Sequence, residues 1–353
     1  MERFKNNTVI FRDCAYKNGK LYFFDADNVF PISLDLDNGK FKILPIENIK
    51  QFRGIPFDLE TEWENCLYAV EMDGKYMCRY QLDTGHVKYI EINCGIRKDG
   101  NLALLEAYNG HIYIFNRFGM VVIYDTKAET VHTVDAAVQD KEFITGCHYG
   151  QSYYLFSNDG TTVLEFDIGS GSWKTHNSAD MLAGQAKVVH AVCDETKIYI
   201  LFENASIVVW NVRENRKQQI DIAKFYYKSN PAVSRMCITD RNIIVLPSLE
   251  KDIVCIEKQT GEAYCMDTYP PDFQYDAGKK KWSKYIGYCE NDTAYYFACR
   301  TSEYILEVSK LSGKLKWIKS KIDEDEQFYY DIAHGVLYEK EGYLELMLKE
   351  ISG

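Results

Sequence analysis

Short runs of apolar and aromatic residues recur along the whole chain at a nearly constant spacing. Successive copies are 41 to 51 residues apart and are centred on Tyr22, Tyr68, Tyr113, Tyr154, Tyr199, Ile244, Tyr295 and Leu337. Runs this short, rich in Tyr, Ile, Val and Phe and bounded by turn residues, are typical of β-strands. The chain therefore reads as eight copies of one unit of about 44 residues.

A tight turn follows many of these runs about 15 residues later. Copies of this turn contain Asn38-Gly39, Thr84-Gly85, Thr260-Gly261 and Ser312-Gly313. Glycine at this place supplies the positive φ that such a hairpin requires. The third unit then divides into strands 102–107, 111–115, 121–125 and 130–134. Four antiparallel strands in each unit of this length predict the blade of a β-propeller.

The sequence thus predicts an all-β fold, in which a single β-propeller domain of eight four-stranded antiparallel blades spans residues 1–353. Seven blades is the alternative. The last unit supplies strands 328–332, 335–338 and 343–349 only. Residues 1–7 are a candidate for its missing outer strand, because closing the ring would remove an open sheet edge.

Individual blades resemble different propeller families. Glu165-Phe166-Asp167 with Trp173 is similar to the end of a kelch repeat, and the segment 309–317, SKLSGKLKW, resembles a quinoprotein-type repeat. The resemblance to the repeat β-propeller superfamily covers essentially the whole chain. However, the Gly-Gly pair of kelch repeats and the adjacent cysteine pair of quinoprotein dehydrogenases do not occur in the sequence. The resemblance therefore implies the fold and no particular activity.

Charge and cysteine content narrow the classes of function. The 41 basic and 52 acidic residues give a net charge of −11, which disfavours nucleic-acid and membrane-surface partners. The first ten residues lack the apolar run of a signal peptide, so we expect a cytoplasmic protein. Eleven cysteines without metal-ligand spacing indicate reduced thiols, and we predict neither a metal nor another cofactor.

Catalytic motifs are absent from the sequence. The spacings of a nucleophile elbow, a phosphate-binding loop and a metalloprotease do not occur. His148 and His190 fall on predicted inner strands, where they could face a central channel, although a structural role is the commoner one for such residues. Enzymatic activity is uncertain and disfavoured. The sequence leaves open whether Arg53, Arg97, Arg235 and Arg300 meet in space.

Long connections between successive blades point to recognition. Residues 47–62, 177–186, 222–233 and 267–283 are longer than a hairpin needs and should share one face. Aromatic and basic residues in two of these loops are the partner-binding candidates: Phe52, Arg53, Phe57, Trp63, Tyr269, Phe273, Tyr275, Lys280 and Trp282. The simpler alternative is that these loops only cap the ring.

The sequence therefore favours a non-catalytic binding or scaffold propeller that presents its long-loop face to a protein partner. The alternative is an enzyme or a sensor that acts on a glycan or another small polar ligand in the central channel. That alternative requires carboxylates, or a carboxylate and a histidine, to converge at the channel.

Overall fold

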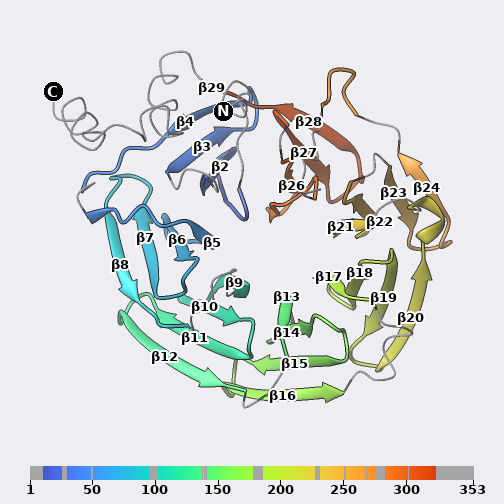
Figure 1. Cartoon of the computed structure of the whole chain (residues 1–353), viewed down its shortest axis with the longest axis horizontal. Coiled ribbons are helices and arrows are strands. Elements are labelled where there is room, and N and C mark those ends of the chain that lie inside the picture. The colour runs from blue at the N-terminus through green and yellow to red at the C-terminus, as the bar shows by residue number, and fades with distance from the viewer. Residues whose placement is uncertain are drawn as a thin grey trace.

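The computed structural model describes residues 11–322 except 26–29, 49–50, 95–101, 137, 139–140, 178–185, 227–230, 250–251, 267–268, 275–282 and 301. These residues form seven blades of four antiparallel strands each, arranged as a ring, and one short further strand joins the sheet of the first blade (Figure 1). A 3-10 turn at Ala223–Phe225 precedes the sixth sheet. No helix in this part of the chain is long and apolar enough to cross a membrane.

Each blade consists of four consecutive strands, and the first three blades come from the N-terminal part of the chain. Blade 1 is β1 (Ala15–Lys17), β2 (Lys20–Phe24), β3 (Pro31–Asp35) and β4 (Lys40–Ile43). Blade 2 is β5 (Phe57–Trp63), β6 (Cys66–Glu71), β7 (Tyr76–Gln81) and β8 (Val87–Glu91). Blade 3 is β9 (Leu102–Tyr108), β10 (His111–Asn116), β11 (Met120–Asp125) and β12 (Thr130–Asp135).

The remaining four blades repeat this order. Blade 4 is β13 (Phe143–Tyr149), β14 (Ser152–Ser157), β15 (Thr162–Asp167) and β16 (Ser172–Asn177). Blade 5 is β17 (Val188–Cys193), β18 (Ile198–Phe202), β19 (Ser206–Asn211) and β20 (Arg216–Asp221). Blade 6 is β21 (Val233–Ile238), β22 (Asn242–Pro247), β23 (Ile253–Glu257) and β24 (Ala263–Met266). Blade 7 is β25 (Cys289–Glu290), β26 (Ala294–Ala298), β27 (Tyr304–Ser309) and β28 (Leu315–Lys319).

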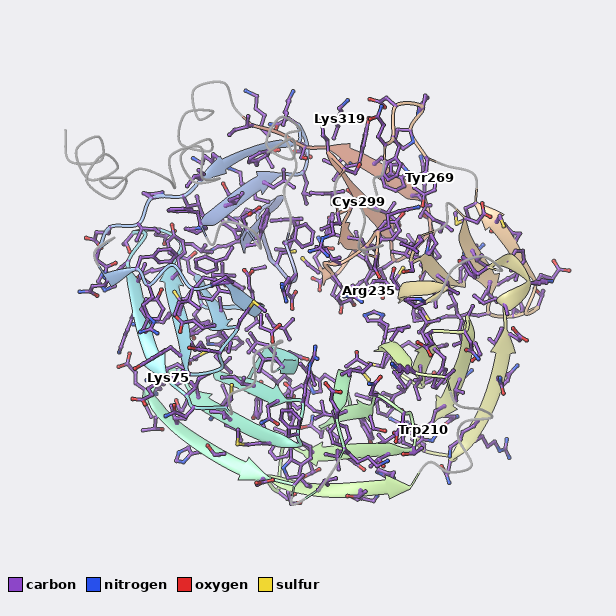
Figure 2. All side chains as sticks on the ribbon, in the orientation of Figure 1. Lys75, Trp210, Arg235, Tyr269, Cys299 and Lys319 are labelled. Carbon is purple, nitrogen blue, oxygen red and sulfur yellow. The ribbon has the colours of Figure 1, made fainter. Side chains whose placement is uncertain are left out.

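The predicted propeller is confirmed, and the strands of blade 3 lie within one residue of their predicted bounds. The alternation of the sequence explains this agreement, because inward-facing apolar residues pack between neighbouring sheets. Trp210 shows the pattern: it is 2% exposed and packs edge-on against Tyr154 of blade 4, with the ring centroids 5.8 Å apart. Figure 2 shows how such side chains fill the space between the blades.

The prediction of eight blades is wrong, and the alternative of seven is confirmed. Blade 1 packs directly on blade 7, because Leu21 and Phe23 share one core cluster with Cys289 and Tyr296. The short strand β29 (Lys321–Ile322) then pairs in parallel with the outer edge of β4 and covers the junction (Figure 1). The eighth predicted unit at 328–349 and the candidate strand at 1–7 lie outside the described residues. The prediction of one domain over 1–353 stays a prediction.

Candidate central channel site

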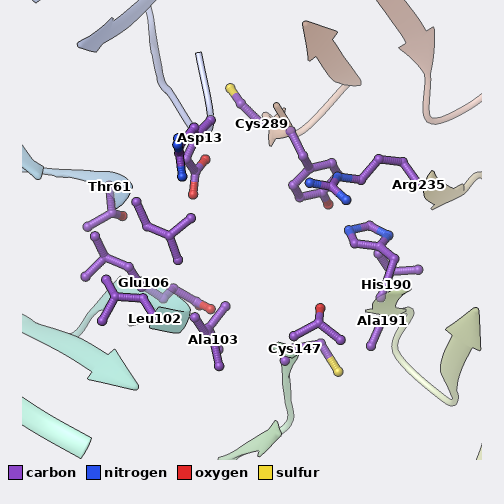
Figure 3. A pocket seen from close by; sticks show the side chains of 18 of the residues that line it. Asp13, Thr61, Leu102, Ala103, Glu106, Cys147, His190, Ala191, Arg235 and Cys289 are labelled. Carbon is purple, nitrogen blue, oxygen red and sulfur yellow. The ribbon is translucent and has the colours of Figure 1, made fainter. Parts of the chain in front are cut away.

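The inner strands of the seven blades surround a cavity of about 830 Å³ (Figure 3). Its lining includes residues from all seven blades or from the segments that precede their inner strands, at 12–14, 58–61, 102–106, 144–148, 189–193, 235, 286 and 288–290. Small-molecule sites in proteins commonly occupy about 300–1,000 Å³. The channel therefore has the size of a ligand site.

A β-bulge recurs at the same place in five inner strands. In β5 the pairing with β6 skips one residue between Phe57 and Leu59. The pairing skips one residue at the same place in β9, β13, β17 and β21. Bulges re-aim the neighbouring side chains and are common next to active sites. The residues that follow the bulge are Leu59, Leu104, Thr145, His190 and Arg235, and all of them line the cavity.

Asp13 occupies the equivalent position in blade 1. Asp13 lies two residues before Ala15, which pairs with Tyr22. His190 and Arg235 likewise lie two residues before the residues that pair with Tyr199 and Ile244. We call Asp13 together with the five residues that follow the bulge the channel ring. One depth of the channel is thus set by these six residues, which are about 45 positions apart in sequence, and by Tyr288 of blade 7, which precedes by two residues the partner of Tyr295.

Arg235 is fixed by the backbone and extends beside the central opening (Figures 2 and 3). One terminal nitrogen donates to the Ser234 carbonyl at 2.9 Å, and the other donates to the Ile286 carbonyl at 2.9 Å. Burial lowers the pKa of the guanidinium from its usual value, although the charge of Asp13 opposes this shift. Within the described residues Arg235 has no carboxylate partner, so three of its five N–H donors remain for a ligand.

His190 provides a neutral donor beside this guanidinium. Its Nδ1 accepts a hydrogen bond from the Met236 backbone N–H at 3.2 Å, which places the ring proton on Nε2. Burial and the nearby charge of Arg235 hold the His190 pKa well below its ordinary value of 6.5. The ring packs edge-on against Tyr288, with the centroids 5.4 Å apart. Among the described residues Nε2–H has no acceptor, so it is available to a ligand.

Carboxyl groups gather on the wall formed by blades 1 and 2. Asp13 accepts a hydrogen bond from the Cys14 N–H at 2.8 Å, and Glu60 accepts one from the Phe24 N–H at 2.8 Å. Burial raises the pKa of both carboxyls well above their ordinary values. Asp58 also lines this wall and forms an ion pair with Arg12 at 3.4 Å.

Carboxylates and histidines do converge at the channel, as the enzyme alternative requires, but hydrogen bonds and burial limit the acid–base and nucleophilic chemistry open to them. Glu106 binds Nδ1 of His148 at 2.8 Å, but Nε2 of His148 is fully buried and has no partner in the described structure. Burial raises the pKa of the Cys14 and Cys289 thiols, which disfavours the nucleophilic thiolate. Among the described residues no group of three or more His, Cys, Asp or Glu side chains is arranged to hold a metal ion.

The first predicted loop is engaged within the protein. Phe52 stacks on Phe24 with the centroids 6.4 Å apart, and Phe57 is only 5% exposed. Arg53 donates to the buried Glu71 carboxylate at 2.8 Å. Trp63 packs against the core between blades 2 and 3. Contacts within the protein therefore account for the presence of these side chains in the loop. Their role in partner binding stays a prediction.

The second predicted loop has a similar structural role where it is described. Tyr269 and Phe273 pack on Trp317 of β28, with centroid distances of 5.0 and 5.1 Å. Tyr269 lies far from the channel, near the outside of blade 7 (Figure 2). The other candidates in this loop, Tyr275, Lys280 and Trp282, lie outside the described residues.

The structure identifies site residues that the sequence reasoning did not select. His148 and His190 do lie on inner strands, as predicted, and both line the channel. Arg235 and Arg300 line it too, whereas Arg53 pairs with Glu71 outside it and Arg97 is not described. Asp13 was not selected at all. Each repeat has a central residue, such as Tyr22, Tyr199 or Ile244, and a partner for it on the inner strand. An alignment of the repeats on these partners places Asp13, His190 and Arg235 in one column, two residues before the partner.

Comparisons with known proteins agree with the fold. No family model and no curated protein sequence matches the chain. A computationally designed protein, Ika8, superposes with a TM-score of 0.61 at 12% identity over 89% of this chain and 88% of its own. Virginiamycin B lyase from Staphylococcus aureus gives 0.62 at 11% identity over 83% and 92%. YCF48 bound to D1 peptide gives 0.62 at 9% identity over 90% and 93%. At these identities the likeness shows the β-propeller fold alone, and the strand pairing of this chain gives the seven blades.

Proposed function

We propose that this chain is a non-catalytic binding propeller and that its central channel receives a carboxylate. The observation that carries the proposal is the arrangement of Arg235 and His190. Both are fixed by backbone hydrogen bonds, both line the cavity, and both keep N–H donors that no described residue accepts. A guanidinium held in advance matches the planar carboxylate and loses little freedom when it binds.

Binding without turnover fits the same geometry. The only lone pair of the neutral His190 ring is on Nδ1 and already accepts the Met236 N–H, so His190 cannot also act as a general base without losing that bond. Similar folds include a lyase and a protein bound to a peptide, so the fold alone selects neither role. The long-loop face as a docking site for a protein remains a separate prediction, because its described aromatic residues pack inward.

The test compares Arg235→Met with Arg216→Met, which makes the same change on β20, where the Arg216 side chain is 83% exposed. Three compounds are titrated by calorimetry: 4-methylpentanoate, its uncharged amide, and the tripeptide Gly-Gly-Leu with a free carboxyl end. We expect one or both carboxylates to bind and the amide not to bind. Loss of a charge-assisted hydrogen bond should weaken carboxylate binding roughly tenfold to a hundredfold in Arg235→Met only.

The pattern of affinities separates two sources of the carboxylate. Binding of 4-methylpentanoate indicates a free small molecule, whereas binding of the tripeptide alone indicates the end of a protein chain. Circular dichroism and the melting temperature of Arg235→Met check that the ring still folds. The proposal is refuted if no carboxylate binds the wild type at millimolar concentration, or if a folded Arg235→Met protein binds as tightly as the wild type.

A further inference from the structure

The channel ring has three chemically different sectors. Blades 5 and 6 contribute the donors His190 and Arg235, and blade 1 contributes the carboxyl of Asp13. Between Asp13 and Thr145, blades 2 and 3 contribute the apolar side chains of Leu59 and Leu104. Figure 3 shows Asp13 across the opening from His190 and Arg235. A symmetric ring of repeats has therefore acquired a polarised channel.

Asp13 and Arg235 influence each other without forming an ion pair. Each charge shifts the pKa of the other group, yet the two side chains are not in ion-pair contact. Asp13 accepts only the Cys14 N–H among the described residues. Glu106 and Glu290 add negative potential and raise the Asp13 pKa further. A buried carboxyl in such surroundings is stabilised as the anion by any cation that enters the cavity.

Building on the proposed function, we infer that the ligand is a small zwitterion, such as a free amino acid, which places its carboxylate at Arg235 and His190 and its ammonium at Asp13. The ammonium neutralises the acidic wall while the carboxylate pairs with the guanidinium. A side chain of the ligand can then lie against Leu59 and Leu104. An apolar amino acid therefore matches all three sectors, whereas a simple acid or a simple amine matches only part of the ring.

The experiment uses three compounds of the same carbon frame. Leucine carries both charges, 4-methylpentanoate lacks the ammonium, and leucinamide lacks the carboxylate. In the wild type leucine should bind about tenfold more tightly than either of the other two, because each of them forfeits one charge-assisted contact. Titration calorimetry of the full-length chain at one pH and ionic strength measures the three affinities.

The Asp13→Asn variant tests the proposed position of the ammonium. Asparagine keeps an oxygen that can accept the Cys14 N–H, so the local backbone should be preserved. The variant should lose about tenfold in leucine affinity. It should bind 4-methylpentanoate about as tightly as the wild type does, because this compound has no ammonium to place at position 13. Glu290→Gln is the matched control, since Glu290 also lines the channel but pairs with Lys310 at 2.6 Å.

The outcomes distinguish this inference from the proposed function. If leucine and 4-methylpentanoate bind the wild type equally, the zwitterion inference is overturned and the carboxylate site stands. If neither compound binds, the inference fails with these compounds, and the tripeptide titration decides whether the carboxylate site survives. If Glu290→Gln lowers the preference for leucine as much as Asp13→Asn does, the general potential of the channel, and not Asp13, selects the ammonium, which also overturns the inference.

Discussion

Closure of the ring can be tested at Gly39, in the turn between β3 and β4. Gly39 has φ 72°, and a Cβ added there would overlap the carbonyl oxygen of Lys319 at the end of β28. The carbonyl of Gly39 also accepts the Lys321 N–H at 2.9 Å, next to the β29–β4 pairing. The contact between Gly39 and the segment 319–321 is thus part of what joins blade 1 to the chain that follows blade 7.

We predict that Gly39→Ala destabilises the protein more than Gly261→Ala. Gly261 occupies the equivalent turn of blade 6 with φ 75°, but an added Cβ there meets no atom within 4 Å. Both substitutions cost about 1–2 kcal/mol for placing a Cβ in the left-handed region. Only Gly39→Ala also displaces the segment 319–321, and loss of the Lys321–Gly39 hydrogen bond costs about 1 kcal/mol. The totals are about 2–3 kcal/mol for Gly39→Ala and about 1–2 kcal/mol for Gly261→Ala.

Urea unfolding of the two variants and the wild type measures this difference. The comparison uses the midpoints at a common slope, because a change in slope would indicate a change in the unfolded state or loss of two-state behaviour. Equal destabilisation by the two substitutions would show that the contact with β28 and β29 adds nothing to stability. The seven-bladed ring would then depend on the core between blades 1 and 7 alone.

Two further predictions concern burial. Burial raises the Glu60 pKa, so the folded state keeps a proton that the unfolded state loses as the pH rises above about 4.5, and stability falls through that window. Glu60→Gln should therefore melt a few degrees above the wild type at pH 8, with a smaller gain at pH 5, and a lower melting temperature at pH 8 would contradict this. Trp210→Ala should cost about 3–5 kcal/mol in urea unfolding, because Trp210 is 2% exposed. Leu311→Ala, at a residue 74% exposed, should change stability by less than about 0.5 kcal/mol, and a similar small effect of Trp210→Ala would refute the importance of packing between blades.

The blades could be predicted because their determinants are local. Alternation of apolar and polar residues defines each strand, and a glycine such as Gly39 or Gly261 marks the turn before the outer strand. The number of blades is a different kind of property. It depends on whether Leu21 of blade 1 meets Cys289 of blade 7, and a contact across about 270 residues leaves no local pattern. The spacing of the apolar runs predicts how many repeats the chain contains, but it does not predict which of them become blades of the ring.

The packing of the two predicted loops also depends on contacts that a local pattern does not show. Aromatic residues in long connections are typical of interfaces, but they are equally suited to covering the gap between two sheets. Tyr269 and Phe273 cover the side of blade 7 by packing on Trp317, and Phe52 covers blade 1 by packing on Phe24. The sequence contains the aromatic residues in both cases. Only the neighbouring blade decides whether they face inward.

The chemistry of the channel arises from one position whose residue differs between blades. The residue after the bulge lines the cavity in five blades, although Leu59 and Leu104 also pack against the cores between blades and His190 accepts the Met236 N–H. Leucine, threonine, histidine and arginine all occur there in blades of the same shape. The chemical character of this position therefore differs between blades that share one strand pairing, and a candidate site built this way has no sequence motif. Its signature is a single variable column in otherwise similar repeats, which is where Asp13, His190 and Arg235 stand.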